Sequence, residues 1–141
     1  MKGFGGGDYK TAWDGNVYTF FDYSKADGGW TEAKLTNGAA TIGHIEYYPR
    51  AGYLTRHIDG GRFVGIKADK SEITLATIPS APKLSWNPLP VAHANATASQ
   101  QWKNASTRAE SDGSQDVVSV KYESAPGSYG NIAEIKLYRA C

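Results

Sequence analysis

The sequence of 141 residues contains one cysteine and has almost no excess of charge of either sign. The single thiol, that of Cys141, cannot form a disulfide within the chain, so packing, hydrogen bonds or a metal must hold the fold. The 15 basic and 14 acidic residues leave a net charge of +1, which argues against a nucleic-acid-binding protein. No hydrophobic run approaches the roughly 18 residues of a membrane-spanning helix.

Motifs of known catalytic sites are missing as well. The three histidines, His44, His57 and His93, do not have the spacing of zinc ligands. The sequence has no Gly-x-Ser-x-Gly elbow and no phosphate-binding loop. A carboxylate pair for glycoside hydrolysis depends on the tertiary structure and leaves no sequence signal. We therefore expect no enzymatic activity. The N-terminus lacks the apolar stretch of a signal peptide, which fits either a mature protein or a domain taken from a longer chain.

Strand signals are plentiful, whereas sustained helical spacing of apolar residues is absent. In residues 42–48, Ile45 and Tyr47 alternate with His44 and Glu46, which is the period of a half-buried strand. The same period recurs at 117–123 and 132–138, and weaker strand signals occur at 30–35, 62–67, 72–78 and 84–91. Glycine-rich turns separate these segments. The sequence therefore predicts one all-β sandwich or barrel over residues 1–141.

Three further expectations concern the parts between these strands. Residues 1–7 contain three consecutive glycines and are expected to form a flexible lead-in segment. The polar stretch 93–116 is expected to be a long connection that carries one extra strand near 101–103. Trp30 is expected to face the core, as large aromatic residues usually do.

Two segments have a composition suited to binding. Asp14, Gly15, Asn16 and Thr19 concentrate oxygen ligands in a tight loop, and calcium binds about six to eight oxygen atoms. The same composition also fits an Asx turn ahead of a strand. Near the C-terminus, Tyr129 and Asn131 precede the last predicted strand, and an aromatic ring beside an amide is a common way to hold a sugar. A β-turn whose tyrosine only packs is the alternative there.

Four blocks, residues 13–22, 45–50 with Arg56, 60–63 and 127–135, together resemble the coagulation-factor type C, or discoidin-like, domain. They are most similar to family 32 carbohydrate-binding modules, which are appended to secreted glycoside hydrolases. The resemblance covers nearly the whole chain. It implies a jelly-roll β-sandwich of the galactose-binding-domain-like type, with a five-stranded sheet facing a smaller one.

The resemblance also implies a calcium ion between the early loop and the last strand. It assigns side-chain oxygens of Asp14 and Glu134, side-chain or carbonyl oxygens of Asn16 and Thr19, and the carbonyls of Trp13 and Ala133. Such an ion would join the two ends of a chain that has no internal disulfide.

The sugar site of the resembling family lies in loops at one end of the sandwich. Carried over, it includes Arg50, Arg56, His57 and Tyr129. We add Asn131, the amide beside Tyr129, and Tyr23, which lies where galactose binders of the family often have His and Trp. Arg50 also fits a structural bond to backbone carbonyls, and Arg56 and His57 also fit loop supports. We expect a secreted, non-catalytic, lectin-like module for a galactose-type glycan, either tethered to a glycoside hydrolase or self-associating. A protein- or membrane-interaction domain on the same scaffold, with Tyr53 and Leu54 as its apolar loop pair, is the alternative.

Overall fold

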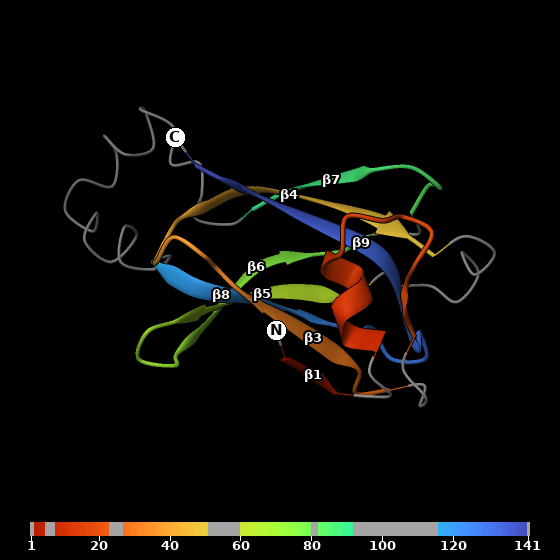
Figure 1. Cartoon of the computed structure of the whole chain (residues 1–141), viewed down its shortest axis with the longest axis horizontal. Helices are drawn as coiled ribbons and strands as arrows, with labels where there is room; N and C mark the ends of the chain where they lie inside the picture. The colour runs from red at the N-terminus through yellow and green to blue at the C-terminus, as the bar shows by residue number, and fades with distance from the viewer. Residues whose placement is uncertain are drawn as a thin grey trace.

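Two antiparallel β-sheets packed face to face make up the protein (Figure 1). The computed structural model describes residues 2–4, 8–22, 27–50, 60–79, 82–91 and 116–140. A five-stranded sheet has the order β1-β3-β8-β5-β6, and a four-stranded sheet has the order β2-β9-β4-β7. The elements are β1 (Lys2–Phe4), the 3-10 helix η1 (Asp8–Trp13), β2 (Phe21–Asp22), β3 (Trp30–Lys34), β4 (Ile42–Pro49), β5 (Arg62–Lys67), β6 (Glu72–Thr77), β7 (Asn87–Pro90), β8 (Val117–Glu123) and β9 (Gly130–Arg139). The predicted all-β sandwich is confirmed.

All seven strands expected from the sequence are present, with boundaries within three residues of those predicted. In β4, Ile45 and Tyr47 are buried while His44 and Glu46 on the opposite face are half-buried, as the period of two requires. Alternation is less regular in β9, where Glu134 lies on the side expected to face solvent and yet is buried. The cause is a loop from the other end of the sequence that covers it.

The chain differs from the sequence-based expectations at two described places. Part of the segment expected to be flexible, Lys2–Phe4, forms the edge strand β1, because its backbone pairs with β3 from Lys2 opposite Glu32 to Phe4 opposite Trp30. Trp30 does not face the core: its neighbour Thr31 is the buried residue, and the Lys121 ammonium lies over the Trp30 ring at 5.8 Å. The extra strand expected near 101–103 lies outside the described residues.

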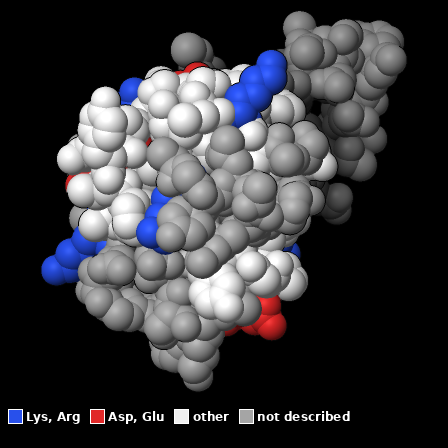
Figure 2. Space-filling model, turned by 90° about the vertical axis from the view of Figure 1, so that its right-hand side faces the viewer, with Lys and Arg blue, Asp and Glu red and all other residues white. Residues whose placement is uncertain are grey.

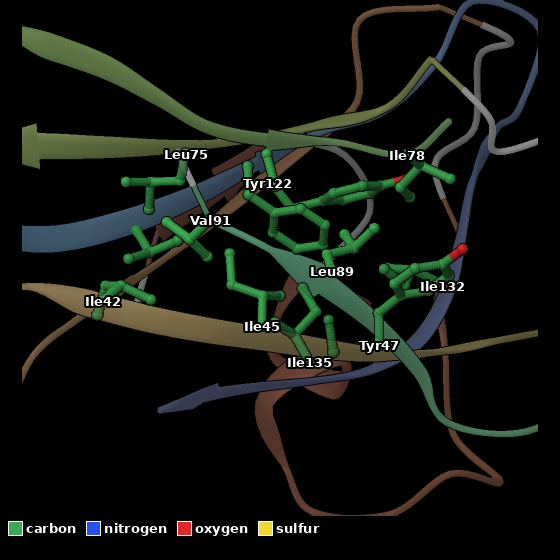
Figure 3. Close-up of a cluster of buried hydrophobic side chains, with 14 of the residues drawn as sticks. Ile42, Ile45, Tyr47, Leu75, Ile78, Leu89, Val91, Tyr122, Ile132 and Ile135 are labelled. Carbon is green, nitrogen blue, oxygen red and sulfur yellow. The ribbon is translucent and has the colours of Figure 1, made fainter. Parts of the chain in front are cut away.

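The hydrophobic core fills the space between the two sheets. Phe63 and Tyr122 from the five-stranded sheet lie with ring centroids 5.2 Å apart, and Tyr47 from the other sheet is 6.4 Å from Phe63. Aliphatic side chains from both layers surround these rings, and Figure 3 shows them pointing toward one another. Within the described residues the one helix is η1, which at six residues is far too short to cross a bilayer.

The pairing of β4 with β9 is irregular at the end of the sandwich where β4 ends and β9 begins. Tyr48 lies opposite Glu134 and Pro49 lies opposite Ile132, with a register shift between the two pairs. Such irregularities twist a strand locally and change the direction of the residues that follow. Arg50, directly after β4, is thereby brought to the start of β9, where its amide donates to the Asn131 carbonyl at 3.3 Å.

Candidate functional site

The candidate site lies at the right-hand end of the sandwich in Figure 1, where β4 ends and β9 begins. Seen from this side in Figure 2, the described surface carries separate basic and acidic residues rather than one charged patch. The described residues of this end therefore offer individual polar and aromatic contacts.

Arg50 is the central described side chain of this end. Its guanidinium carbon lies 3.6 Å from the centroid of the Phe20 ring, a close cation–π contact. Its Nη1 donates a hydrogen bond of 3.1 Å to Oδ1 of Asn131. A ring beneath the plane and an amide at one edge together fix the orientation of the guanidinium, which is half-buried. Arginine held in this way presents a rigid fork of N–H donors.

Asn131 supports Arg50 from a loop of unusual backbone conformation. Tyr129, Gly130 and Asn131 have φ angles of 57°, 83° and 47°, so three successive residues are left-handed. At Gly130 a side chain would meet the Phe21 ring at 2.9 Å, so only glycine fits there. The Asn131 side chain is 1% exposed, and its amide nitrogen donates to the Ser128 carbonyl. Both ends of the amide are thus engaged within the protein, while Tyr129 remains half-exposed.

The loop after η1 is held by its own side chains. Asp14 Oδ1 accepts from the Asn16 amide at 2.9 Å, and Asn16 Oδ1 accepts from the Tyr18 amide at 2.9 Å, which makes two successive Asx turns. The Thr19 hydroxyl donates to Asp14 Oδ2 at 2.6 Å. Gly15 supplies the left-handed residue at φ 79° that the turn requires. The Asx turn considered from the sequence is present in this loop.

Glu134 meets this loop across 119 positions of sequence, because the Gly15 amide donates to its Oε2 at 2.7 Å. The carboxyl is 3% exposed, and its Oε1 has no hydrogen-bond partner among the described residues. Burial raises the pKa of Glu134 to about 7, the Gly15 amide opposes that rise, and the neighbouring Asp14 adds to it. A carboxylate forced close to another one, with a buried and unpaired oxygen, is the arrangement that a bound cation would satisfy.

The residues predicted as calcium ligands therefore fit a cation in part. Asp14 and Glu134 are brought together, and Ala133 and Trp13 adjoin them in sequence at the buried start of β9 and the end of η1. The side chains of Asn16 and Thr19 hydrogen-bond within the loop. The described part of the chain holds no group of three or more His, Cys, Asp or Glu side chains around one point. The remaining ligands of a calcium ion would have to be carbonyl, amide or water oxygens, as calcium accepts.

Three predicted sugar-site residues, Tyr23, Arg56 and His57, lie outside the described residues, as does the apolar pair Tyr53 and Leu54. Sequence reasoning missed Phe20, the ring beneath Arg50. The Phe20-Phe21 doublet could have indicated it, because consecutive residues of an extended chain face opposite sides and only one of the two rings can enter the core. Phe21 is fully buried, which leaves Phe20 on the side of Arg50.

Comparison with solved structures finds the same fold in carbohydrate-binding proteins. The family 62 carbohydrate-binding module of Clostridium thermocellum Xyl5A is 29% identical, with a TM-score of 0.74, over 99% of this chain and 92% of that one. The family 32 module CBM32-5 of Clostridium perfringens, solved with GalNAc-β-1,3-galactose, is 16% identical with a TM-score of 0.61, over 92% and 81% of the two chains. The lectin domain of lectinolysin, complexed with Lewis b antigen, is 17% identical with a TM-score of 0.59, over 94% and 84%.

Other matches include a family 32 module of a glycoside hydrolase and an F5/8 type C domain from Bacteroides fragilis. The chain thus matches carbohydrate-binding modules of families 62 and 32 and F5/8 type C domains over nearly its whole length, which confirms the resemblance found in the sequence. No protein-family model matches the sequence, and no curated protein is significantly similar to it.

Proposed function

We propose that this chain is a non-catalytic carbohydrate-binding module that holds a galactose-type glycan at the end of the sandwich where β4 meets β9. The observation that carries the proposal is the oriented guanidinium of Arg50, which rests on Phe20 and is tied to Asn131. A fixed fork of donors suits two adjacent sugar hydroxyls, which lie at a similar spacing.

Tyr129 supplies the second element of the site. It has a left-handed backbone and a half-exposed side chain, and it lies two residues before Asn131 in the loop that supports Arg50. An aromatic ring stacks on the apolar face of a pyranose and contributes about 1 kcal/mol beyond the buried area. In this arrangement Asn131 is a positioning residue that acts through Arg50. Tyr23, Arg56 and His57 are proposed as further contacts.

The choice of a galactose-type sugar is supported by the relatives. A family 32 module with this fold is solved with GalNAc-β-1,3-galactose, and the lectin domain of lectinolysin is solved with Lewis b antigen. A shallow end site with one arginine and one or two rings is expected to bind single sugars with dissociation constants of roughly millimolar to micromolar. Several copies of the module, or its attachment to a catalytic domain such as a glycoside hydrolase, would hold the protein on a glycan more tightly than one site alone. We also propose an extracellular location, where such glycans are displayed.

Calcium is proposed as a structural ion of this module. Asp14 and Glu134 would hold it with oxygens of Trp13, Asn16, Thr19 and Ala133, and the unpaired Oε1 of Glu134 supports the assignment. When bound, the ion supplies positive charge that offsets the repulsion between two adjacent carboxylates. It would also fix the loop after η1 against β9, which stabilises the folded state because the unfolded chain lacks the site.

Isothermal titration with GalNAc-β-1,3-galactose in calcium-containing buffer tests the proposal. Wild-type protein is expected to bind, and Arg50→Ala is expected to weaken binding at least tenfold. The matched control is Arg139→Ala, which removes the same charge from an exposed position at the opposite end of β9. Equal loss in both variants, or no binding of any galactose-type glycan by the wild type, would refute the proposal. Co-sedimentation with liposomes that persists in excess sugar would instead favour the membrane-interaction alternative.

A further inference from the structure

A pocket of about 390 Å³ lies at the other end of the sandwich from Arg50. It is formed where β3 and β5 end and β8 begins, beside the β5–β6 hairpin at the left of Figure 1. Pockets that bind small ligands are typically about 300 to 1,000 Å³, so one or two sugar rings fit this volume. Nothing in the proposed glycan site uses any residue of this pocket.

Basic side chains dominate the polar part of the lining. Lys34, Lys67 and Lys70 line the pocket together with one acidic residue, Glu32, so its lining has a formal charge of +2 at neutral pH. The whole chain has a net charge of only +1, so positive charge is concentrated here relative to the rest of the molecule. A basic concavity of this kind attracts an anionic group.

Glu32 adds a hydrogen-bond acceptor to a lining whose other charged residues are lysines. The Ser119 hydroxyl, which is 4% exposed, donates to Glu32 Oε2 at 2.8 Å. This bond fixes the carboxylate, which can accept hydrogen bonds only, on the strand β3 that also carries Lys34. Simple phosphate or sulfate would gain nothing from a carboxylate, whereas a sugar hydroxyl can donate to it.

The hairpin that carries the other two lysines has a defined shape. The Lys70 amide donates to the Lys67 carbonyl at 2.9 Å, and the Lys67 amide donates to the Ser71 carbonyl at 2.9 Å. Asp69 Oδ1 accepts from both the amide and the hydroxyl of Ser71, at 2.9 and 2.6 Å. Lys70 has a left-handed backbone with φ 71°. The basic side chains thus project from an ordered turn, and ordering before binding reduces the entropic cost of binding.

We propose that this pocket is a second ligand site, which takes a sugar residue bearing a carboxylate or sulfate. The lysines would hold the anionic group, Glu32 would accept from a ring hydroxyl, and Ile66 and Val118 would contact the apolar face of the ring. The module would then engage a glycan at two opposite ends. This inference stands independently of the Arg50 site, because the two sites share no residue.

Amide chemical shifts of ¹⁵N-labelled protein, followed during titration with digalacturonic acid, test the inference. Shifts are expected at Lys34, Lys67 and Val118, with weaker affinity at higher salt concentration. The variant Lys34→Gln/Lys70→Asn is expected to weaken binding at least tenfold, and asparagine is suited to the left-handed position. The control Lys10→Gln/Lys83→Gln removes the same charge elsewhere and is expected to bind as the wild type does.

Comparison ligands test separately whether the pocket needs the anionic group and whether it needs the sugar ring. A neutral galactose disaccharide of the same linkage is expected to leave the pocket amides unshifted, and galactose 6-sulfate is expected to shift them. Inorganic sulfate is expected to bind at least tenfold more weakly than the acidic sugar. Sulfate binding as tight as the sugar, equal loss in the control variant, or no shift at the pocket would overturn the inference. Acidic-sugar shifts confined to Arg50 and Asn131 would overturn it too, while leaving the proposed function intact.

Discussion

Replacement of Glu134 by glutamine should stabilise the calcium-free protein and abolish its stabilisation by calcium. In chelator at pH 8.5 the wild-type carboxylate is buried and charged, next to Asp14. The pKa of about 7, against an ordinary value of 4.5, corresponds to an unfavourable contribution of about 3 kcal/mol when the group is fully ionised. Glutamine keeps an oxygen for the Gly15 amide and has no charge. Glu134→Gln is therefore expected to raise the stability of the calcium-free protein by about 2–3 kcal/mol.

The pH dependence follows from the raised pKa. Because the folded state binds the proton of Glu134 more tightly than the unfolded state does, its contribution to stability is fully present below pH 4.5 and is lost as the pH rises through about 7. The stability advantage of Glu134→Gln over the wild type should therefore shrink to below about 1 kcal/mol at pH 4.5.

Glu123→Gln is the matched control, and its effect on stability should have the opposite sign. Burial opposes ionisation of Glu123, but Lys121 and Arg62 outweigh it and lower its pKa, so this variant should be destabilised in chelator.

Differential scanning fluorimetry in chelator and in excess calcium measures both effects. For a chain of this length, 2–3 kcal/mol corresponds to a rise in Tm of roughly 5–10 °C in chelator. Calcium at 100 times its Kd should stabilise the wild type by about 2.7 kcal/mol and leave Glu134→Gln unchanged. A lower Tm of Glu134→Gln in chelator would show that the buried carboxylate is not destabilising. An equal calcium response in both proteins would remove Glu134 from the proposed metal site.

Three further predictions concern the support of the site. Gly130→Ala places a methyl group 2.9 Å from the Phe21 ring at a left-handed position, so urea unfolding should show a loss of about 1–3 kcal/mol, accompanied by weaker glycan binding. Phe20→Ala removes the ring beneath Arg50 and should weaken glycan binding about three- to tenfold in titration calorimetry, with little change in Tm. Leu75→Ala empties part of the fully buried core and should lose about 2–5 kcal/mol in urea unfolding, while the glycan Kd of the folded protein stays the same; any change in that Kd would show that the core and the site are coupled.

The sheet structure could be predicted from the sequence because the period-two pattern is local. Residues 62–67 and 117–123 were placed with the observed boundaries. The pattern misplaced Glu134, whose alternation indicated solvent, because the loop that buries it is 119 positions away. Local sequence carries no information on such a contact. Trp30 was misplaced for a related reason: aromatic residues are usually buried, but here the outer face of the sheet supplies Lys121 as a partner.

The binding site was predictable in type but not in detail. The family resemblance indicates Arg50 and the amide beside Tyr129 indicates Asn131, and the structure joins the two residues through a 3.1 Å hydrogen bond. That the Asn131 amide is buried, and so acts through Arg50, depends on three successive left-handed residues. The sequence indicates a left-handed backbone at Gly130 and Asn131, because glycine and asparagine tolerate that conformation. It gives no such indication at Tyr129.

The central claim is that a glycan binds at the end of the sandwich formed by Arg50 and the loop before β9. Amide chemical-shift mapping of the wild-type protein with GalNAc-β-1,3-galactose, in calcium, tests it most directly. The account predicts that the described amides with the largest shifts are those of Arg50, Tyr129 and Asn131, and that the outer faces of both sheets remain unchanged. Shifts centred on any other described surface, or no shifts with this or any other galactose-type glycan, would contradict it.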